Sequence, residues 1–444
     1  MAKVEAQRAS TVPARATQGA EARKDWSWVE ALVWTERMVS ALENGVKGGR
    51  WYSLMDKVFA PDTLEAAWEK VRVNDGAAGV DRQSIERFDA NDEQYLAELS
   101  TALRDGSYRP QSIRRVEIPK GDGRTRPLGI PTVKDRIVQT TVKFALEPIC
   151  EAMFRPTSYG FRPGLGCKDA LREVARLIAD GYTFVVDADF ESYFDSIPHE
   201  PLMRRVEERV SDGRILSLLR SWLDQDILHG MQRWTPTAGT PQGAVISPLL
   251  ANIYLHPLDE LMAARGYRMV RYADDFVVLC RSPQEAAAAL ATIQAWVVEN
   301  GLRLHPQKTH LGDCRQAGQG FEFLGYRFEA GQRWVRKKSV DQLKDKIRAR
   351  TRRTCGQSYP RIIKSLNSVL KGWFAYFQHA NPYTFRMLDQ FIRRRLRSIL
   401  LKQTMKQSGY GLSRATHQRW PNSFFAEAGL LALHMAWLNA RHSR

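Results

Sequence analysis

Residues 269–280, with the sequence MVRYADDFVVLC, decide the fold class of this 444-residue chain. Asp274 and Asp275 interrupt a stretch that is otherwise apolar and β-branched, which predicts two strands bent at the acidic pair. An exposed Asp-Asp turn normally has Gly or Asn beside it, but this pair lies between Ala273 and Phe276. Because burial of unpaired charge costs several kcal/mol, the pair requires a compensating partner.

A third acid ends another apolar strand upstream. Residues 183–189, with the sequence TFVVDAD, stop on Asp189, 85 residues before Asp274. A divalent cation would stabilise these carboxylates, because Mg²⁺ prefers hard oxygen ligands. Two such ions about 3.5–4 Å apart can activate a hydroxyl and stabilise a leaving pyrophosphate. The residues alone therefore predict a metal-dependent phosphoryl-transfer site at strand ends.

The net charge of +17 is concentrated in one part of the chain. Residues 331–444 hold 24 Lys or Arg and 4 Asp or Glu, whereas residues 1–330 hold 42 and 45. A strongly basic region beside a near-neutral one favours a polyanionic partner, nucleic acid first and an anionic membrane second. A merely solvated basic surface is the alternative, but it would spread the charge more evenly.

Cysteine usage and hydropathy exclude other classes of protein. The five cysteines are widely spaced and form no CxxC pair, which argues against a disulfide framework or a cysteine zinc module and favours a reducing cytoplasm. No apolar run approaches the ~20 residues of a membrane span. Residues 1–25 lack the hydrophobic stretch of a secretory signal and are expected to form a polar, disordered arm.

Hydrophobic periodicity predicts a mixture of helices and strands. Helices are expected over residues 26–41, 92–103, 135–153, 201–210, 215–224, 247–262 and 282–300. A further helix is expected to begin at Thr63, with Asp62 as its N-cap. The strands are expected over residues 114–119 and 125–130, joined by a hairpin turn at 120–124, and over 183–189, 269–280 and 321–328. From Ser339 onward the pattern is helical and basic.

Three motifs in order give this pattern a family resemblance. Residues 272–275 (YADD) resemble the YxDD box of reverse transcriptases, and residues 187–195 (DADFESYFD) resemble their first acidic motif. Residues 239–253 (GTPQGAVISPLLANI) are similar to the intervening (T/V)PQG…SPxLxN motif. Residues 190–192, Phe-Glu-Ser, stand where the family usually has Ile-Lys-Gly, which leaves the ligand position Asp189 untouched.

Further segments resemble bacterial group II intron reverse transcriptases, and class C in particular. Residues 126–131 (RPLGIP) and 158–163 (SYGFRP) resemble their fingers, and residues 43–58 resemble their N-terminal extension. Residues 372–377 and 391–397 are similar to the maturase, or thumb, domain. After Ser408 the sequence offers no paired Cys with the His residues that the family's optional HNH endonuclease domain needs, so we expect that domain to be lacking.

The resemblance implies an α+β fold, a right-hand polymerase of fingers and palm with an antiparallel palm sheet, followed by an α-helical thumb or maturase domain. The expected divisions are a disordered arm over 1–25, a helical N-terminal extension over 26–75, fingers over 76–180, palm over 181–330, thumb over 331–405 and a basic DNA- or RNA-binding segment over 406–444.

The resemblance also implies a function. We expect an RNA-directed DNA polymerase, a nucleotidyltransferase, that binds its intron RNA as a maturase and aids splicing and retrohoming by target-primed reverse transcription. A domesticated reverse transcriptase in phage defence or DNA repair stays open, as does an RNA-binding splicing scaffold with an idle polymerase. The intact acids argue against the scaffold, and an intron fold in the flanking DNA would separate the first two functions.

The cofactors and partners follow from the same resemblance. Two Mg²⁺ ions are expected, with Mn²⁺ as a substitute. The expected partners are group II intron RNA, an RNA template, a DNA primer or target DNA, and dNTPs, with no membrane and with a homodimer left open. The expected location is the bacterial cytoplasm, in association with the nucleoid through nucleic acid.

By resemblance, particular residues take particular roles. Asp189, Asp274 and Asp275 are the expected metal ligands, with the Phe190 backbone carbonyl as a further donor. Lys308 matches a catalytic palm lysine able to protonate pyrophosphate. The residues expected to bind the nucleotide are Lys120 and Arg126 at the triphosphate, Phe194 as a gate against the ribose 2′-hydroxyl, and Gln242 at the template or nucleotide.

Two more sets complete the expected site. The primer grip is expected at Phe323, Leu324, Gly325 and Tyr326. RNA-binding cations are expected on one helix at Lys344, Lys346, Arg348, Arg350, Arg352 and Arg353, and on another at Arg393, Arg394, Arg395 and Arg397. Between them lie Trp373, Phe374, Tyr376 and Phe377, of which at least two are expected in the helix-bundle core.

Overall fold

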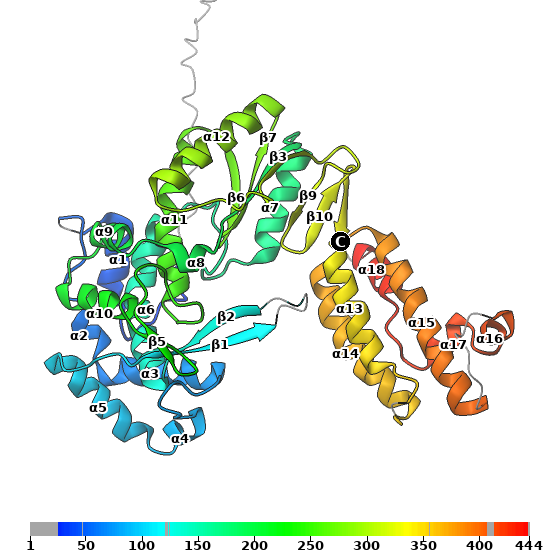
Figure 1. Ribbon diagram of the computed structural model, residues 1–444, viewed down its shortest axis with the longest axis horizontal. Helices are drawn as coiled ribbons and strands as arrows, with labels where there is room; N and C mark the ends of the chain where they lie inside the picture. The colour runs from blue at the N-terminus through cyan, green and yellow to red at the C-terminus, as the bar shows by residue number, and fades with distance from the viewer. Residues whose placement is uncertain are drawn as a thin grey trace, which may run out of the picture.

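The computed structural model describes residues 25–46, 48–119, 123, 125–354, 356–405 and 413–442. Residues 1–24 of the expected N-terminal arm and most of the hairpin turn at 120–124, including Lys120, lie outside the described residues. The C-terminal helices of the thumb lie beside the fingers and palm along the longest direction of the molecule (Figure 1). Within these residues no helix is long and apolar enough to cross a membrane.

The fingers combine helices with a four-stranded sheet. The helices are α1 (Glu36–Asn44), α2 (Met55–Val58), α3 (Pro61–Asn74), α4 (Ile85–Asp89), α5 (Asp92–Asp105) and α6 (Val133–Met153). The sheet has the order β2-β1-β4-β5, from β1 (Ile113–Pro119), β2 (Thr125–Ile130), β4 (Ile227–His229) and β5 (Gln232–Trp234). The antiparallel β1–β2 hairpin was predicted. Strands β4 and β5 fall in the range expected for the palm, yet β4 pairs with β1 in the fingers.

Two expected helix starts were wrong for local reasons. The helix expected from residue 26 begins at Glu36, because the Thr35 side chain accepts a hydrogen bond from the Met38 N–H and caps it there. Residues 26–34 instead form turns that bury Val33 and Trp34. Helix α3 begins at Pro61, which occupies its first position, so Asp62 lies inside the helix rather than at its cap.

The palm is an antiparallel sheet in the order β6-β7-β3-β8, which confirms the expected fold class. Its strands are β3 (Phe184–Asp189), β6 (Arg268–Tyr272), β7 (Asp275–Cys280) and β8 (His310–Asp313). Residues on opposite faces of β3 and β7 enter two separate hydrophobic clusters. One cluster includes α11 (Ser247–Ala264) and α12 (Pro283–Glu299), and the other includes α7 (Cys167–Ala179), which was expected in the fingers.

Short helices connect the fingers and palm, and a small sheet leads to the thumb. The connecting helices are α8 (Tyr193–Ser196), α9 (His199–Glu207) and α10 (Gly213–Leu223). The small sheet has the order β11-β10-β9, from β9 (Phe321–Phe323), β10 (Tyr326–Glu329) and β11 (Gln332–Val335). It shares a hydrophobic cluster with the palm sheet and with the thumb, so it couples the two parts.

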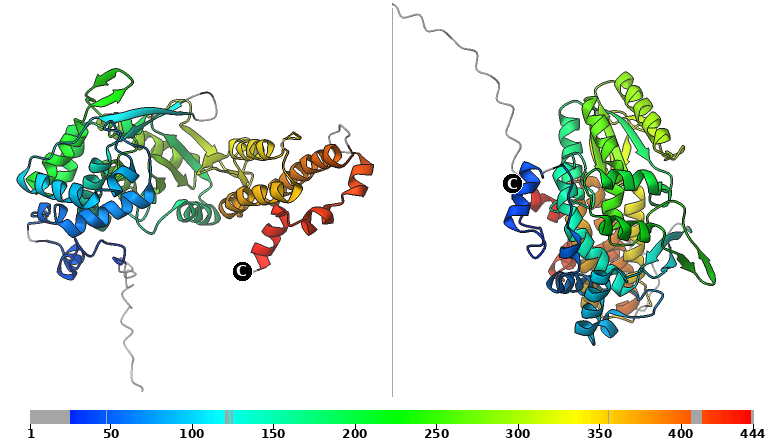
Figure 2. Two further views of the ribbon diagram at one scale, coloured as in Figure 1. Left: turned by 90° about the horizontal axis from the view of Figure 1, so that it is seen from below. Right: turned by 90° about the vertical axis from the view of Figure 1, so that its left-hand side faces the viewer.

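The thumb is helical, as expected. It contains α13 (Lys337–Arg350), α14 (Tyr359–Phe377), α15 (Pro382–Met405), α16 (Arg414–Arg419), α17 (Asn422–Glu427) and α18 (Leu433–His442). Helix α13 ends at Arg350, so Arg352 and Arg353 follow it and do not lie on it as predicted. The described part of the C-terminal segment packs on the thumb core, and α18 runs back along α15 (Figure 2).

The turn between β6 and β7 rests on one buried cation. The Arg271 side chain is fully buried, and its guanidinium donates to both carboxylate oxygens of Asp259 at 2.8 and 2.5 Å. It also donates to Asn252 Oδ1 at 2.8 Å and to the Ala273 carbonyl at 2.9 Å. The Asn252 amide in turn donates to the Gly160 carbonyl at 2.8 Å. Arg271 therefore joins the strand, helix α11 and the loop around Gly160.

Close packing fixes the same turn from the other side. Ala273 has a left-handed φ of 59°, which L-residues rarely adopt. A Cβ at Gly160 would lie 2.2 Å from the Ala273 nitrogen, so only glycine allows the loop to approach.

Asp259→Asn should strongly destabilise the fold, because it leaves the Arg271 guanidinium buried without a counter-charge. The expected loss of unfolding free energy is about 3–5 kcal/mol. Glu260→Gln is the matched control one residue along α11, since its pair with Arg155 is exposed and worth about 0–1 kcal/mol. Urea denaturation of the two variants measures both losses, and equal losses would contradict this role for Arg271.

Candidate active site

Three carboxylates meet at one corner of the palm sheet. Asp189 ends β3 and lies directly opposite Asp275, the first residue of β7, in the antiparallel register. Asp274 precedes it in the tight turn that Arg271 supports. The structure thus brings together the three acids that the sequence placed 85 residues apart.

The corner is electrostatically strained. Burial raises the pKa of Asp275 to about 7, and the charges of Asp187, Asp274 and Asp189 add to that increase. Burial also raises the pKa of Asp274, with a further contribution from Asp189. Asp187, which the sequence analysis did not select, has a pKa raised to about 7, chiefly by burial. Its alternation with Asp189 on β3 was the signal that could have identified it.

Lys308 joins these acids from a loop beside β8. Its ammonium forms an ion pair with the Asp189 carboxylate. The loop is held in place because the His305 N–H donates to the Asp189 carbonyl at 2.7 Å. A cavity of about 530 Å³ opens here, lined by Asp187, Asp189, Asp275, Lys308 and residues of the small sheet that include Glu322 and Gly325. It links the acids to the predicted primer grip.

The donor chemistry of this corner suits a hard divalent cation. In the described part of the chain no three Asp, Glu, His or Cys side chains form a ready-made metal centre. The negative charge of Asp189 helps to raise the pKa of Asp274, and Asp189 and Asp274 together help to raise that of Asp275, so a shared cation would stabilise the ionised group of three. Oxygen atoms are the ligands that Mg²⁺ prefers. Phe190 directly follows Asp189, and its side chain is buried, so any contribution from it comes from its backbone.

Gln242 connects the fingers to the palm near the acids. Its Oε1 accepts a hydrogen bond from Arg126 Nε at 3.0 Å, and its amide donates to Asp195 Oδ2 at 3.3 Å. Its carbonyl accepts from the Gly129 N–H at 2.6 Å. Gly243 follows with a φ of 109°, where a Cβ would lie 2.4 Å from the Gly129 carbonyl. Arg126 and Gln242, each predicted to bind the nucleotide or template, are thus in contact with each other, and Asp195 is a partner that the sequence analysis did not name.

Phe194 lies within an aromatic group next to the acidic turn. Its ring centroid is 6.5 Å from that of Phe161, which in turn is 6.5 Å from Tyr272. The Phe194 carbonyl accepts from the Thr240 N–H at 2.6 Å, which fixes α8 against the loop before Gln242. Phe161 has a φ of 58° and an exposed side chain, and sequence reasoning missed it because its segment was read only as a family motif.

The predicted primer grip divides into packed and accessible residues. Phe323 and Tyr326 are buried, and the Tyr326 hydroxyl donates to the Tyr376 carbonyl at 2.6 Å. The Tyr376 hydroxyl donates back to the Leu324 carbonyl at 2.8 Å. Leu324 and Gly325 form the tight turn with positive φ values of 47° and 82°. The turn is therefore the part that can meet a primer, and the buried rings hold it to the thumb.

The thumb arginines have different roles. Lys346, Arg348 and Arg394 are exposed, and Lys344 and Arg393 are half-buried. Arg395 instead donates to Thr351 Oγ1 at 2.5 Å and to the Thr351 carbonyl at 2.9 Å, at the end of α13. The predicted RNA contact at Arg397 was wrong: this side chain is buried and donates to the Trp420 carbonyl and to Asn422 Oδ1.

The aromatic residues between the two basic helices belong to the core more than to the surface. Phe377 is buried, and Trp373, Phe374 and Tyr376 are partly buried against the same cluster. The rings of Trp373 and Phe374 both contact Phe385. The expectation that at least two of the four are core residues is confirmed.

Comparisons with known proteins agree with this geometry. Residues 118–328 match the reverse transcriptase (RNA-dependent DNA polymerase) family, and residues 340–420 match the group II intron maturase-specific domain. The chain is 34% identical to Protein YkfC of Escherichia coli K12 over 62% of this chain and 82% of that protein. It is 36% identical to Group II intron-encoded protein LtrA of Lactococcus lactis over 46% of this chain and 34% of LtrA.

A solved structure also resembles the chain. A chain of a partial Cas6-RT-Cas1–Cas2 complex is 26% identical, with a TM-score of 0.36 over 56% of this chain and 41% of that one.

The acidic corner, the contact between Arg126 of the fingers and Gln242, and the matched polymerase family define a reverse transcriptase, an RNA-directed DNA polymerase. With its maturase domain, the chain belongs to the family of group II intron reverse transcriptases and maturases. Enzymes of this class use divalent metal ions.

The raised pKa values of the corner predict that the folded protein becomes less stable as the pH rises, and that bound Mg²⁺ offsets this loss. Because folding raises the pKa of Asp187 and Asp275, the neutral acids favour the folded state. Their stabilisation is full below about pH 4 and is lost as the pH rises through about 7. With a chelator present, the Tm should fall between about pH 5 and pH 8, and Asp275→Asn should reduce that fall.

Adding Mg²⁺ should raise the Tm of the wild-type protein at about pH 8 more than at about pH 5, because the ion binds ionised carboxylates. Thermal melts of both proteins, with and without Mg²⁺, measure these effects. Identical pH profiles for the wild type and Asp275→Asn would contradict the electrostatic account of the corner.

Proposed function

We propose that the chain holds two Mg²⁺ ions at Asp189, Asp274 and Asp275, with the Phe190 carbonyl as a further donor, and copies intron RNA into DNA there. The observation that supports this most directly is the register that sets Asp189 opposite Asp275, one residue after Asp274. When bound, the ions would activate a primer 3′-hydroxyl and stabilise the charge on the leaving pyrophosphate.

The chain's own residues position the other groups. Arg126 has a fork of donors suited to the triphosphate of an incoming dNTP, and its bond to Gln242 holds it over the palm. Lys120, outside the described residues, is proposed to share that role. Lys308 is close enough to Asp189 to deliver a proton to pyrophosphate as it leaves. Phe194 is proposed to exclude the ribose 2′-hydroxyl.

The maturase domain supports a second part of the proposal. The chain would bind group II intron RNA through the exposed cations of the thumb, assist its splicing, and reverse transcribe it from a primer in the target DNA. The matched maturase segment, residues 340–420, contains α14, α15 and most of α13, where Lys346, Arg348 and Arg394 are exposed. Exposed Lys and Arg on successive helices neutralise phosphates, which gives affinity without base specificity.

Asp274→Asn should abolish RNA-templated primer extension, because it removes a ligand charge from the proposed metal site. A loss of several orders of magnitude in rate is expected, with folding and RNA binding retained. Asp187→Asn is the matched control: it removes a buried carboxyl from the same cavity but not a proposed ligand. Single-turnover extension measures both rates, and near wild-type extension by Asp274→Asn would overturn the assignment.

Replacing Arg393 and Arg394 with Gln should weaken binding to intron RNA in a salt-dependent way. Loss of two phosphate contacts should flatten the slope of log affinity against log salt by about 1.4 to 1.8. Extension on a short, saturating primer–template should change less, since the acids lie in the palm.

The matched control is Arg37→Gln with Arg87→Gln, two charges on α1 and α4 that lie far from the thumb in sequence. Filter binding at several salt concentrations measures the slopes. An unchanged slope in the thumb variant, or an equal change in the control, would place the RNA contacts elsewhere.

A further inference from the structure

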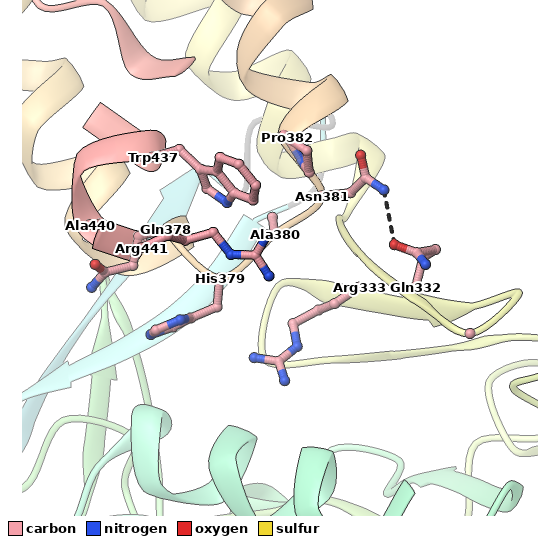
Figure 3. A pocket seen from close by; sticks show the side chains of 11 residues that line it. Gln332, Arg333, Gln378, His379, Ala380, Asn381, Pro382, Trp437, Ala440 and Arg441 are labelled. Carbon is pink, nitrogen blue, oxygen red and sulfur yellow. Dashed lines mark hydrogen bonds between the residues drawn. The ribbon is translucent and has the colours of Figure 1, made fainter. Parts of the chain in front are cut away.

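A groove whose described lining holds no acidic side chain lies where the thumb meets the palm and the small sheet (Figure 3). Its first part is a cavity of about 490 Å³ whose described lining includes Arg333 of β11, His379 after α14, and Trp437 and Arg441 of α18. Its second part, about 340 Å³, shares Arg333 and His379 and continues to Lys168 of α7. The two parts therefore form one continuous surface.

Buried polar contacts hold α18 at the groove. Asp389 of α15 is buried, and its carboxylate accepts from the backbone N–H groups of Leu433 and His434 at 2.9 and 3.0 Å. These contacts satisfy two of the free N–H groups at the start of α18. Arg386 Nε also donates to the His434 ring at 2.9 Å. The groove-lining face of α18 is thus fixed before any ligand arrives.

The groove places cations beside an aromatic platform. The Arg441 guanidinium carbon lies 4.6 Å from the centre of the Trp437 ring, and the His434 ring stacks on Trp437 with its centre 6.2 Å away. Figure 3 shows His379 and Arg333 around the same space. Arg333 lies over the rings of Tyr326 and Phe328, and burial lowers its pKa, so its charge is poorly solvated. Among the described residues, Arg333 and Arg441 have no carboxylate partner. A phosphate would supply the missing negative charge.

This groove is separate from the acidic cavity, although its second part is lined by Tyr326 of the predicted primer grip. The lining of the acidic cavity shares no residue with either part of the groove. In the view from below, α7 and α18 lie on the side of the molecule opposite the β1–β2 hairpin of the fingers (Figure 2). The matched family segments, residues 118–328 and 340–420, include neither Arg333 nor Trp437 and Arg441.

We infer that the groove binds a single-stranded segment of RNA, with one base stacked on Trp437 in the place that the Arg441 guanidinium now covers, and with the flanking phosphates at Arg441, turned away from the ring, and at Arg333. The inference rests on the proposed role of the chain in binding intron RNA. Unpaired bases expose the faces that stack on aromatic rings, whereas paired bases do not. Gln332 and Asn381 also line the first part, where the Asn381 amide donates to Gln332 Oε1 at 3.0 Å. Their remaining amide groups suit a ribose 2′-hydroxyl, which favours RNA over DNA.

The size of the groove agrees with this occupant. Each part falls within the ~300–1,000 Å³ of sites that hold small ligands, so the first part can take one nucleotide. The run from Arg441 past Arg333 to Lys168 would carry the backbone onward over the palm.

The test uses the full chain saturated with a DNA primer on an RNA template, so that the polymerase site is filled. The probe is a single-stranded RNA of about ten nucleotides with 2-aminopurine at its centre, a base whose fluorescence falls when it stacks. Trp437→Ala should weaken binding roughly five- to 150-fold and remove the fluorescence change. Arg441→Gln should weaken binding and lower the salt slope by about 0.7.

Met435→Ala is the matched control, because Met435 is exposed on the same helix and does not line the groove. Control binding equal to the wild type, with both groove variants impaired, supports the inference. Wild-type binding by Trp437→Ala overturns it. If a DNA probe of the same sequence binds with the same affinity as the RNA probe, and its binding also depends on Trp437, the assignment to RNA is overturned.

Primer extension and intron RNA binding are measured on the same proteins. If the wild-type chain extends primers and binds intron RNA but probe binding does not depend on Trp437, this inference alone is overturned. A wild-type chain that neither extends a primer nor binds intron RNA overturns the proposed function instead.

Discussion

The buried ion pair between Arg271 and Asp259 is the constraint on which the active site depends. It lies directly beneath the turn that carries Asp274 and Asp275, and one of its donors holds the carbonyl of Ala273. If the turn were flexible, Asp274 and Asp275 would move away from each other and from Asp189 at the end of β3, because like charges repel. A fully buried guanidinium with four hydrogen bonds resists that relaxation, because any motion would leave charge or carbonyl oxygen unsatisfied.

The same network determines how the fingers reach the palm. Asn252 accepts a hydrogen bond from Arg271 and donates one to the Gly160 carbonyl, so it fixes the Gly160 loop relative to the turn. Phe161, the next residue of that loop, contacts the Phe194 ring. The Gln242 loop ties β2 to this arrangement through Gly129 and Arg126. Residues of the proposed nucleotide site are thus positioned by backbone contacts at glycines, where no side chain would fit.

The sequence predicted what local pattern determines. Apolar strands ending on Asp189 and Asp274 predicted the palm sheet and its acidic corner, and the β1–β2 hairpin followed from alternation and turn residues. Residues whose roles depend on distant partners escaped prediction. From the sequence, Arg271 was interpreted as an ordinary strand residue. Arg397 was interpreted as an RNA contact, because its contact with Trp420 depends on how the C-terminal segment folds back and no local pattern indicates it.

Basic composition likewise says where charge is, but not what it does. The net positive charge of residues 331–444 predicted a nucleic-acid surface, yet Arg395 and Arg397 hold helices together. Arg333 and Arg441, which no motif singled out, line a groove beside Trp437 in which the described residues include no acid. The thumb therefore divides its arginines between its own architecture and the polyanions that it is proposed to bind.

The central claim is that Arg271 holds the acidic turn in the geometry needed for metal-dependent DNA synthesis. The most direct measurement is the Mg²⁺ dependence of single-turnover primer extension by Arg271→Lys, which keeps the buried charge but loses the forked donors. The account predicts a folded protein that needs more Mg²⁺ and extends more slowly even at saturating Mg²⁺. A folded Arg271→Lys protein with the wild-type rate and the wild-type Mg²⁺ requirement would contradict it.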